Sequence, residues 1–148
     1  MGKMSGEATA EIAAPMERCY EIAADVDNID QWQKGVQHVN VLERDGEGRP
    51  LLVEITNDAK VRSVKTKVRF SYDPPRGLSW KQEKGDLKSL EGSWRFTDGG
   101  GTTTATYALD GDPGTMLGML VRGPVEGLLR DMLVNGRPEE LKARAERG

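Results

Sequence analysis

Apolar and polar residues alternate along most of the middle of the chain, from residue 39 to residue 109. The clearest stretch places Val64, Val68 and Phe70 on one face of a strand, with lysine and arginine between them. Because successive side chains of a strand point to opposite faces, such alternation is typical of a strand with one buried face. The pattern predicts strands over residues 7–12, 39–43, 51–57, 64–72, 78–82, 90–97 and 103–109.

Short segments rich in aspartate, glycine and proline separate these strands. Residues 45–48 are Asp-Gly-Glu-Gly, residues 73–77 are Asp-Pro-Pro-Arg-Gly, and residues 98–101 are Asp-Gly-Gly-Gly. Glycine supplies the positive φ of tight turns, and proline cannot continue a sheet ladder. The last segment lacks the lysine and the helix of a phosphate-binding loop, so it too is a turn. The strands from residue 39 onward are therefore predicted to form an antiparallel meander.

Two short helices are predicted between the first strand and this meander. Pro15 suits the first turn of a helix, and apolar residues follow it at steps of three and four until Val26. Asp27 is in a position to cap a second short helix that runs to Trp32.

The widest apolar pattern lies near the C-terminus, over residues 116–132. Apolar residues recur there at helical spacing, which predicts a long helix with a broad apolar face. Gly123 and Pro124 are expected to bend it early. Proline in a helix interior costs roughly 3 kcal/mol, so we also expect a kink or break near Gly136, with Pro138 beginning a short helix through residue 145.

This order of elements indicates an α+β fold. One strand, two short helices, a run of about six strands and a long helix keep the strands together in sequence, unlike the alternation of an α/β protein. The chain has 148 residues and no internal repeat or linker. A chain of that length is typical of one domain, so a single domain over residues 1–148 is predicted.

Charge and composition limit the partners. The 21 basic and 24 acidic side chains give a net charge of −3, so nothing attracts the whole chain to nucleic acid. Arg122 and Glu126 interrupt the apolar run near the C-terminus, so no stable membrane insertion is expected. The first residues lack the apolar core of a signal peptide, which favours the cytoplasm. Either a monomer or a homodimer is compatible with this composition.

Catalytic and metal-binding patterns are largely missing from the sequence. His38 is the only histidine and Cys19 is the only cysteine, so a metal site or a disulfide framework is not expected. Cys19 falls on the apolar face of the first helix and is predicted to be a buried small hydrophobe. The Lys65, Lys67 and Arg69 stripe is predicted to be a solvated sheet surface. No carboxylate pair can be assigned acid and base roles, and we expect no catalytic residue, no metal and no cofactor.

Three strand motifs carry a resemblance to a known family. They are Leu-Ser-Trp at residues 78–80, Leu-Glu-Gly-Ser-Trp-Arg-Phe at 90–96, and Gly-Thr-Thr-Thr-Ala-Thr-Tyr-Ala-Leu at 101–109. With the order of elements, the chain resembles the START-like (SRPBCC) superfamily, and within it the small bacterial polyketide cyclase/dehydrase and lipid transport proteins. The resemblance implies a helix-grip fold: a curved antiparallel sheet of about seven strands wrapped around a long C-terminal helix, with a hydrophobic cavity between them.

The cavity can be assigned residue by residue from the side of each strand that would face the helix. Small residues among bulky ones are expected to leave room, while tyrosine, tryptophan, asparagine and glutamine supply polar groups. The predicted ligand-binding residues are Val53, Ile55, Asn57, Val68, Phe70, Tyr72, Leu78, Trp80, Gln82, Leu90, Gly92, Trp94, Phe96, Ala105, Tyr107, Met116, Met119, Leu120, Leu128 and Met132. Val64 shares the inward face of its strand with Val68 and Phe70.

Three functions are compatible with such a cavity. The leading hypothesis is binding or carriage of a hydrophobic small molecule, such as a lipid, a quinone or a polyketide-like compound. The second is a polyketide cyclase or dehydratase, which would need an inward general base as well as donors to an enolate. The third is a protein-interaction module. The fold does not decide among them.

Overall fold

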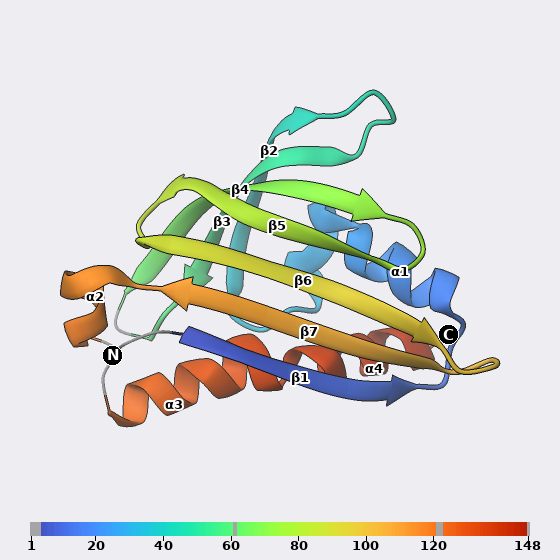
Figure 1. Cartoon of the computed structure of the whole chain (residues 1–148). Helices are drawn as coiled ribbons and strands as arrows, with labels where there is room; N and C mark the ends of the chain where they lie inside the picture. Colours follow the sequence, from blue (N-terminus) through green and yellow to red (C-terminus); the bar gives the residue numbers. More distant parts are fainter. Residues whose placement is uncertain (1–3, 61, 121–122, 148) are drawn as a thin grey trace.

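The computed structural model describes residues 4–60, 62–120 and 123–147, apart from the side chain of Met116. Seven strands form one antiparallel sheet in the order β1-β7-β6-β5-β4-β3-β2, as Figure 1 shows. The strands are β1 (Met4–Ile12), β2 (Val36–Arg44), β3 (Pro50–Asp58), β4 (Ser63–Asp73), β5 (Gly77–Gly85), β6 (Ser89–Asp98) and β7 (Thr103–Asp112). The predicted meander is therefore confirmed, and β1 completes it by pairing with β7.

Helices follow the first and the last strands, as the sequence predicts. After β1 come α1 (Met16–Ala24) and the 3-10 helix η1 (Val26–Gln31), and after β7 come α2 (Gly114–Leu120), α3 (Pro124–Arg130), the π-helical turn η2 (Asp131–Asn135) and α4 (Arg137–Glu146). The segment from α3 to α4 runs along the sheet beside β1 (Figure 1). A curved seven-stranded sheet around a C-terminal helical segment confirms the predicted helix-grip architecture.

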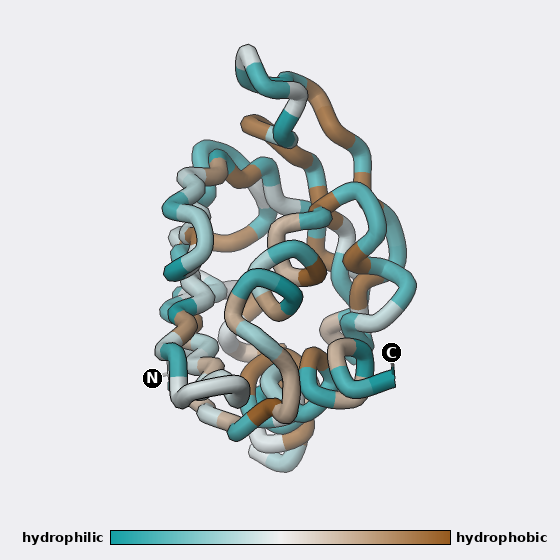
Figure 2. The backbone as a smooth tube through the Cα atoms, turned by 90° about the vertical axis from the view of Figure 1, so that its right-hand side faces the viewer, coloured by the Kyte–Doolittle hydropathy of each residue, from teal (hydrophilic) through white to brown (hydrophobic). Residues whose placement is uncertain are grey.

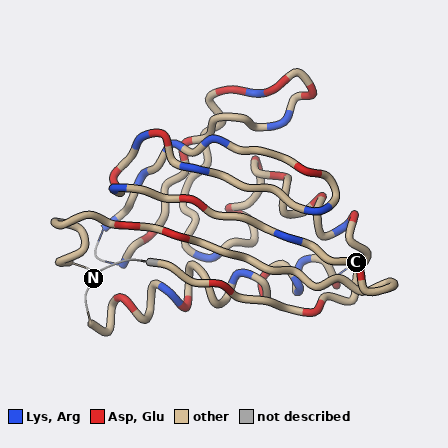
Figure 3. The backbone as a smooth tube through the Cα atoms, viewed as in Figure 1, with Lys and Arg blue, Asp and Glu red and all other residues tan. Residues whose placement is uncertain are grey.

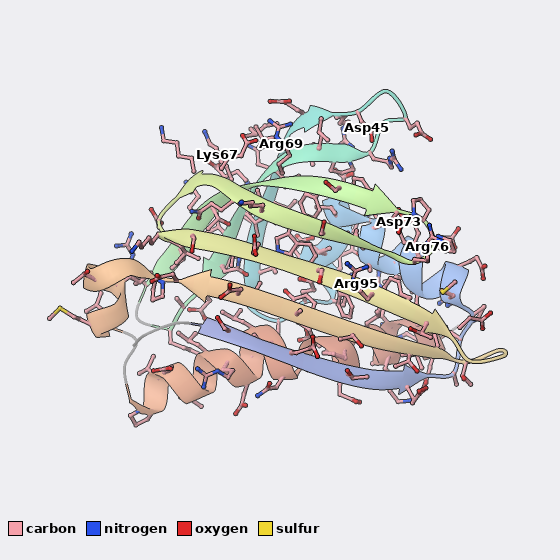
Figure 4. The ribbon with its side chains drawn as sticks, in the orientation of Figure 1. Asp45, Lys67, Arg69, Asp73, Arg76 and Arg95 are labelled. Atoms are coloured by element: carbon pink, nitrogen blue, oxygen red, sulfur yellow. The ribbon has the colours of Figure 1, made fainter. Side chains whose placement is uncertain are left out.

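Alternation of side chains decides which face of the sheet is buried. In β4, Val64, Thr66, Val68 and Phe70 are buried. The basic residues between them point outward, and Figure 4 shows Lys67 and Arg69 directed away from the sheet. The predicted solvated stripe is thus on the outer face of the sheet.

The C-terminal helical region is less continuous than the apolar pattern predicts. A single helix over residues 116–132 is wrong, because α2 ends at Leu120 and α3 begins only at Pro124. Gly123, between them, has φ +71° and ψ −138°, which is not a helical conformation. The predicted break near Gly136 is confirmed, since η2 ends at Asn135 and α4 begins at Arg137 with Pro138 in its first turn.

The two edges of the sheet differ. Helix α4 is joined to the end of the β1 edge: the Lys142 ammonium donates to the Glu11 carbonyl at 2.9 Å, and just after the strand the Ala13 amide donates to Glu146 Oε2 at 2.7 Å. At the opposite edge, the pairing of β2 with β3 is irregular at three places along the strand. The β2–β3 hairpin extends past the rest of the molecule in Figure 2.

Buried apolar residues fall into two clusters. The larger joins α1, η1 and α4 to the sheet and includes Trp94, Phe96 and Leu141. The smaller gathers Ala59, Val64, Leu117, Leu129 and Met132. Acidic and basic residues are intermixed along the strands (Figure 3). Within the described ranges, no helix is both long and apolar enough to cross a membrane.

Candidate functional site

A cavity of about 120 Å³ lies between the inner face of the sheet and the helices, where the two apolar clusters meet. Its walls are predominantly apolar, with a few polar groups. The lining residues are Ala23, Val26, Ile29, Gln33, Val36, Ile55, Asn57, Ala59, Val64, Thr66, Val68, Phe70, Leu78, Trp80, Leu87, Leu90, Trp94, Tyr107, Leu109, Gly111, Pro113, Leu117, Leu129, Leu133 and Arg137.

Strand alternation builds the sheet side of this cavity. The four buried side chains of β4 all line it, from Val64 to Phe70. Phe70 contacts Trp80 with ring centroids 5.7 Å apart, and Trp80 contacts Tyr107 at the same distance. Tyr107 in turn lies 4.7 Å from Trp94. These aromatic contacts fix the ring positions across the sheet and give the cavity a rigid apolar wall.

Helical spacing builds the opposite side. Leu129, Leu133 and Arg137 are four residues apart, so they share one face of the helical segment from α3 to α4 and all three line the cavity. Ala23 comes from α1, and Ile29 comes from η1.

Arg137 is the charged residue of the lining, and it is almost completely buried, with 3% of its surface exposed. Its Nη1 donates to the Lys34 carbonyl at 2.7 Å and to Glu140 Oε1 at 3.0 Å. The Lys34 amide donates to Glu140 Oε2 at 2.9 Å, so the ion pair holds both backbone groups of Lys34. Arg137 Nε has no hydrogen-bond partner despite its burial.

Two further polar groups face the cavity near this ion pair. Burial raises the pKa of Tyr107. The charge of the Arg137 guanidinium and its hydrogen bond to the phenol oxygen offset this only in part, so the phenol stays protonated at neutral pH. Asn57 pairs across the β2–β3 ladder with Val36, which follows Lys34 by two residues in the chain. The Asn57 Oδ1 is buried without a hydrogen-bond partner. Unsatisfied buried polar atoms are rare, and they mark places where a ligand or water can bind.

Several side chains that the sequence assigns to the cavity do line it. They are Ile55, Asn57, Val68, Phe70, Leu78, Trp80, Leu90, Trp94 and Tyr107. Val53, Phe96, Ala105 and Met132 are buried but belong to the packed core instead. The side chain of Met116 lies outside the described residues.

Three helical assignments are wrong. Met119, Leu120 and Leu128 are 61%, 54% and 58% exposed, so they do not line the cavity. The break after α2 separates Met119 and Leu120 from the helix that packs on the sheet. Leu128 lies on α3, but the adjacent Leu129 takes the inward position.

Three strand assignments also need correction. The Tyr72 hydroxyl donates to the Pro50 carbonyl, and its ring lies under the Arg49 guanidinium, so this side chain anchors β3. Gln82 turns to the β5–β6 connection, where its Nε2 donates to the Leu87 carbonyl at 2.9 Å. Gly92 leaves no room, because a Cβ there would lie 2.6 Å from the Trp80 ring.

Other lining residues were not predicted. Ala23, Val26, Ile29 and Gln33 come from the segment of the two short helices, where the apolar pattern predicts only packing. Arg137 was missed because a charged residue between Gly136 and Pro138 suggests a surface turn. Its spacing of four from Leu133 was the available signal.

The other residues considered for chemistry lie outside this cavity. His38 is exposed on β2, and Cys19 is fully buried, where burial raises its thiol pKa. Over the part of the chain that the structure describes, no cluster of three metal-ligating side chains occurs.

Comparison with known proteins places the chain in a family. The sequence model of the family described as polyketide cyclase / dehydrase and lipid transport matches residues 12–136. A search of curated proteins finds no match.

Three solved structures illustrate the likeness in fold. A START superfamily protein from Mycobacterium smegmatis is 21% identical, with 97% of each chain covered and a TM-score of 0.78. The protein TTHA0849 from Thermus thermophilus is 24% identical over 96% of this chain and 98% of that one, also with a TM-score of 0.78. The Zhui aromatase/cyclase from Streptomyces sp. R1128 is 22% identical, covers 98% of this chain and 83% of its own, and has a TM-score of 0.66.

Proposed function

Because this chain belongs to the polyketide cyclase / dehydrase and lipid transport family, we propose that it binds and carries a hydrophobic small molecule in the cavity between its sheet and its C-terminal helices. The observation that supports this most is the cavity itself. The buried side chains around it leave a space that they do not fill. Its walls are apolar except at the Arg137 end. An apolar pocket with a few placed polar groups is the usual form of a small-molecule site.

The volume of the cavity limits the size of the ligand that it can hold. An engineered apolar cavity of about 150 Å³ binds benzene, whereas sites for drug-sized ligands span about 300–1,000 Å³. At about 120 Å³, the cavity accommodates a body the size of one ring. A longer molecule would place one ring or a short chain segment inside, and the remainder would need α2 or α3 to move.

A cyclase activity ranks second. Tyr107 and the Arg137 Nε could donate to a developing enolate oxygen, which favours this alternative. The described lining residues, however, include no aspartate, glutamate or histidine to act as the general base. The cavity volume of about 120 Å³ is also small for a poly-ketone of several rings. Binding therefore fits the site better than cyclisation does.

Filling the cavity tests the proposal. Ala23 is buried in α1 and lines the cavity, so Ala23→Leu extends a side chain into the ligand space without breaking the helix. We expect binding of isopropylbenzene, a ring-sized hydrocarbon, to weaken by at least about tenfold, measured by NMR titration. The melting temperature should hold or rise, because cavity filling commonly stabilises a protein.

Ala143→Leu is the matched control, since it makes the same change on the exposed face of α4. Its affinity for isopropylbenzene should equal that of the wild type. Equal affinities in Ala23→Leu and Ala143→Leu would place the ligand elsewhere, and a wild type that binds no ring-sized compound would reject the proposal.

A further inference from the structure

We infer that the Arg137 end of the cavity recognises a neutral carbonyl oxygen of the ligand, through donation from Arg137 Nε and the Tyr107 hydroxyl, and that it disfavours a carboxylate. This inference rests on the proposed function, because it assigns the chemical class of the ligand for the same cavity. Three features of the site support it: an unpartnered donor, a second donor beside it, and a charge that is already balanced.

First, the Arg137 Nε is a buried donor for which no acceptor lies in hydrogen-bonding geometry. The side chain lines the cavity, is 3% exposed, and has committed its Nη1 to Lys34 and Glu140. A buried donor without a partner destabilises the empty site, and a ligand that supplies an acceptor removes this cost. A hydrocarbon of the same shape cannot do so.

Second, Tyr107 supplies another donor to the same end of the cavity. Its oxygen accepts a hydrogen bond from the Arg137 side chain, and its ring is held by contacts with Trp80 and Trp94, so the phenol proton is left to donate to a ligand. Its buried phenol is neutral and keeps its proton. A carbonyl oxygen has two lone pairs, so it can accept from both groups at once.

Third, the charge of Arg137 is already balanced. Glu140 Oε1 lies 3.0 Å from Nη1, and the Glu140 side chain is 21% exposed, so the pair is largely shielded from water. A carboxylate ligand would bring a second negative charge to a neutral pair in an apolar surrounding, where uncompensated charge is costly. A ketone or quinone oxygen uses the donors without adding charge.

Three compounds of similar size separate these possibilities. Acetophenone carries a carbonyl, isopropylbenzene replaces it by an apolar group, and benzoate replaces it by a carboxylate. By NMR titration of the wild type at neutral pH, we expect acetophenone to bind about tenfold more tightly than isopropylbenzene, as one satisfied buried hydrogen bond implies. Benzoate should bind least tightly.

Each other result is decisive. Equal affinity for acetophenone and isopropylbenzene overturns the carbonyl subsite but leaves the proposed hydrophobic binding intact. Tightest binding of benzoate overturns the preference for a neutral oxygen. Absence of binding by all three compounds overturns the proposed function together with the inference.

Two variants locate the effect while keeping Arg137, whose loss could unfold the protein. Tyr107→Phe removes only the hydroxyl, so the preference for acetophenone over isopropylbenzene should fall at least about threefold. Glu140→Gln removes the balancing charge, so benzoate should gain at least about tenfold in affinity. Glu139→Gln makes the same charge change on the exposed face of α4 and should leave benzoate binding unchanged. An unchanged preference in Tyr107→Phe, or equal benzoate binding in the two glutamine variants, would overturn the assigned roles.

Discussion

The Arg137 guanidinium holds a backbone segment and also faces a cavity. Its Nη1 and the Glu140 carboxylate together bind the carbonyl and the amide of Lys34, at the point where the chain leaves η1 for β2. This tie fixes the position of Val36 and, across the β2–β3 pair, of Asn57. One side chain therefore links the C-terminal helix to the far edge of the sheet and shapes the polar end of the cavity.

Arg137→Met should lower the free energy of unfolding by about 3 kcal/mol. The substitution keeps an unbranched side chain but leaves Glu140 and the Lys34 carbonyl without their partner, and breaking a largely buried ion pair in this way is strongly destabilising. Urea unfolding monitored by circular dichroism measures the change.

Arg144→Met is the control on the same helix. The Arg144 Nη2 donates to Gln31 Oε1 at 2.9 Å on the surface, where water replaces a lost partner, so this variant should change stability by less than about 1 kcal/mol. Equal losses of unfolding free energy in the two variants would show that burial of the Arg137–Glu140 ion pair does not increase its contribution to stability.

Small residues at the sheet surface show why a cavity is hard to predict from composition. Glycine at position 92, among large aromatic neighbours, suggested open space, but the Trp80 ring occupies the position that a side chain would take. Alternation gives the face on which a residue lies, and not the rotamer of the aromatic ring beside it.

At the scale of secondary structure, the strands were more predictable than the helices. Alternation in residues 64–72 gave β4 nearly to its ends, because one face is buried along most of its length. The apolar pattern of residues 116–132 is broad enough to fit one helix, although the backbone of Gly123 is not helical. The sequence pattern placed the short helices α1 and η1 correctly. Their contribution to the cavity depends on how they pack across the sheet, and the spacing of apolar residues does not contain that information.

Glycine-to-alanine substitutions before and within α3 should have opposite effects. Gly123 has φ +71° and ψ −138°, a region that alanine avoids, so Gly123→Ala should destabilise the protein by about 1–3 kcal/mol. Gly127 lies inside α3 with open space where a Cβ would stand, so Gly127→Ala should stabilise it by about 0.5–1 kcal/mol. Thermal unfolding of both variants measures the effects, and a stabilising Gly123→Ala would contradict the non-helical backbone at the break between α2 and α3.

At the scale of the whole molecule, the cavity separates two apolar clusters that would otherwise be one core. Leu129 and Val64 belong to one cluster, and Trp94 and Ile29 belong to the other. A ligand that fills the space joins these clusters and is expected to stabilise the fold by binding the native state alone.

The tyrosines make the fold sensitive to alkaline pH. Burial raises the pKa of Tyr20, Tyr72 and Tyr107, whereas in the unfolded chain tyrosine titrates near pH 10. Below about pH 10 both states hold these protons, and stability is unaffected. Above it the unfolded state loses its protons first, so the free energy of unfolding falls as pH rises, by up to about 1.4 kcal/mol per pH unit for each tyrosine.

Tyr72→Phe tests this dependence. Urea unfolding between about pH 9 and pH 11 should show a smaller loss of stability per pH unit in the variant than in the wild type, because one shifted group has been removed. Parallel curves for the two proteins would mean that Tyr72 titrates alike in the folded and unfolded chains.

The unequal edges of the sheet bear on the pairing of exposed strands between molecules. An open, regular edge strand is a template on which a second molecule can add its own strand and begin a fibril. Here the Lys142 ammonium of α4 occupies the Glu11 carbonyl near the end of β1, and three irregularities in the pairing of β2 disturb the spacing of its hydrogen-bonding groups. Both features make these borders less regular templates for an added strand, so a sheet that curves around a cavity offers a poorer seed for aggregation.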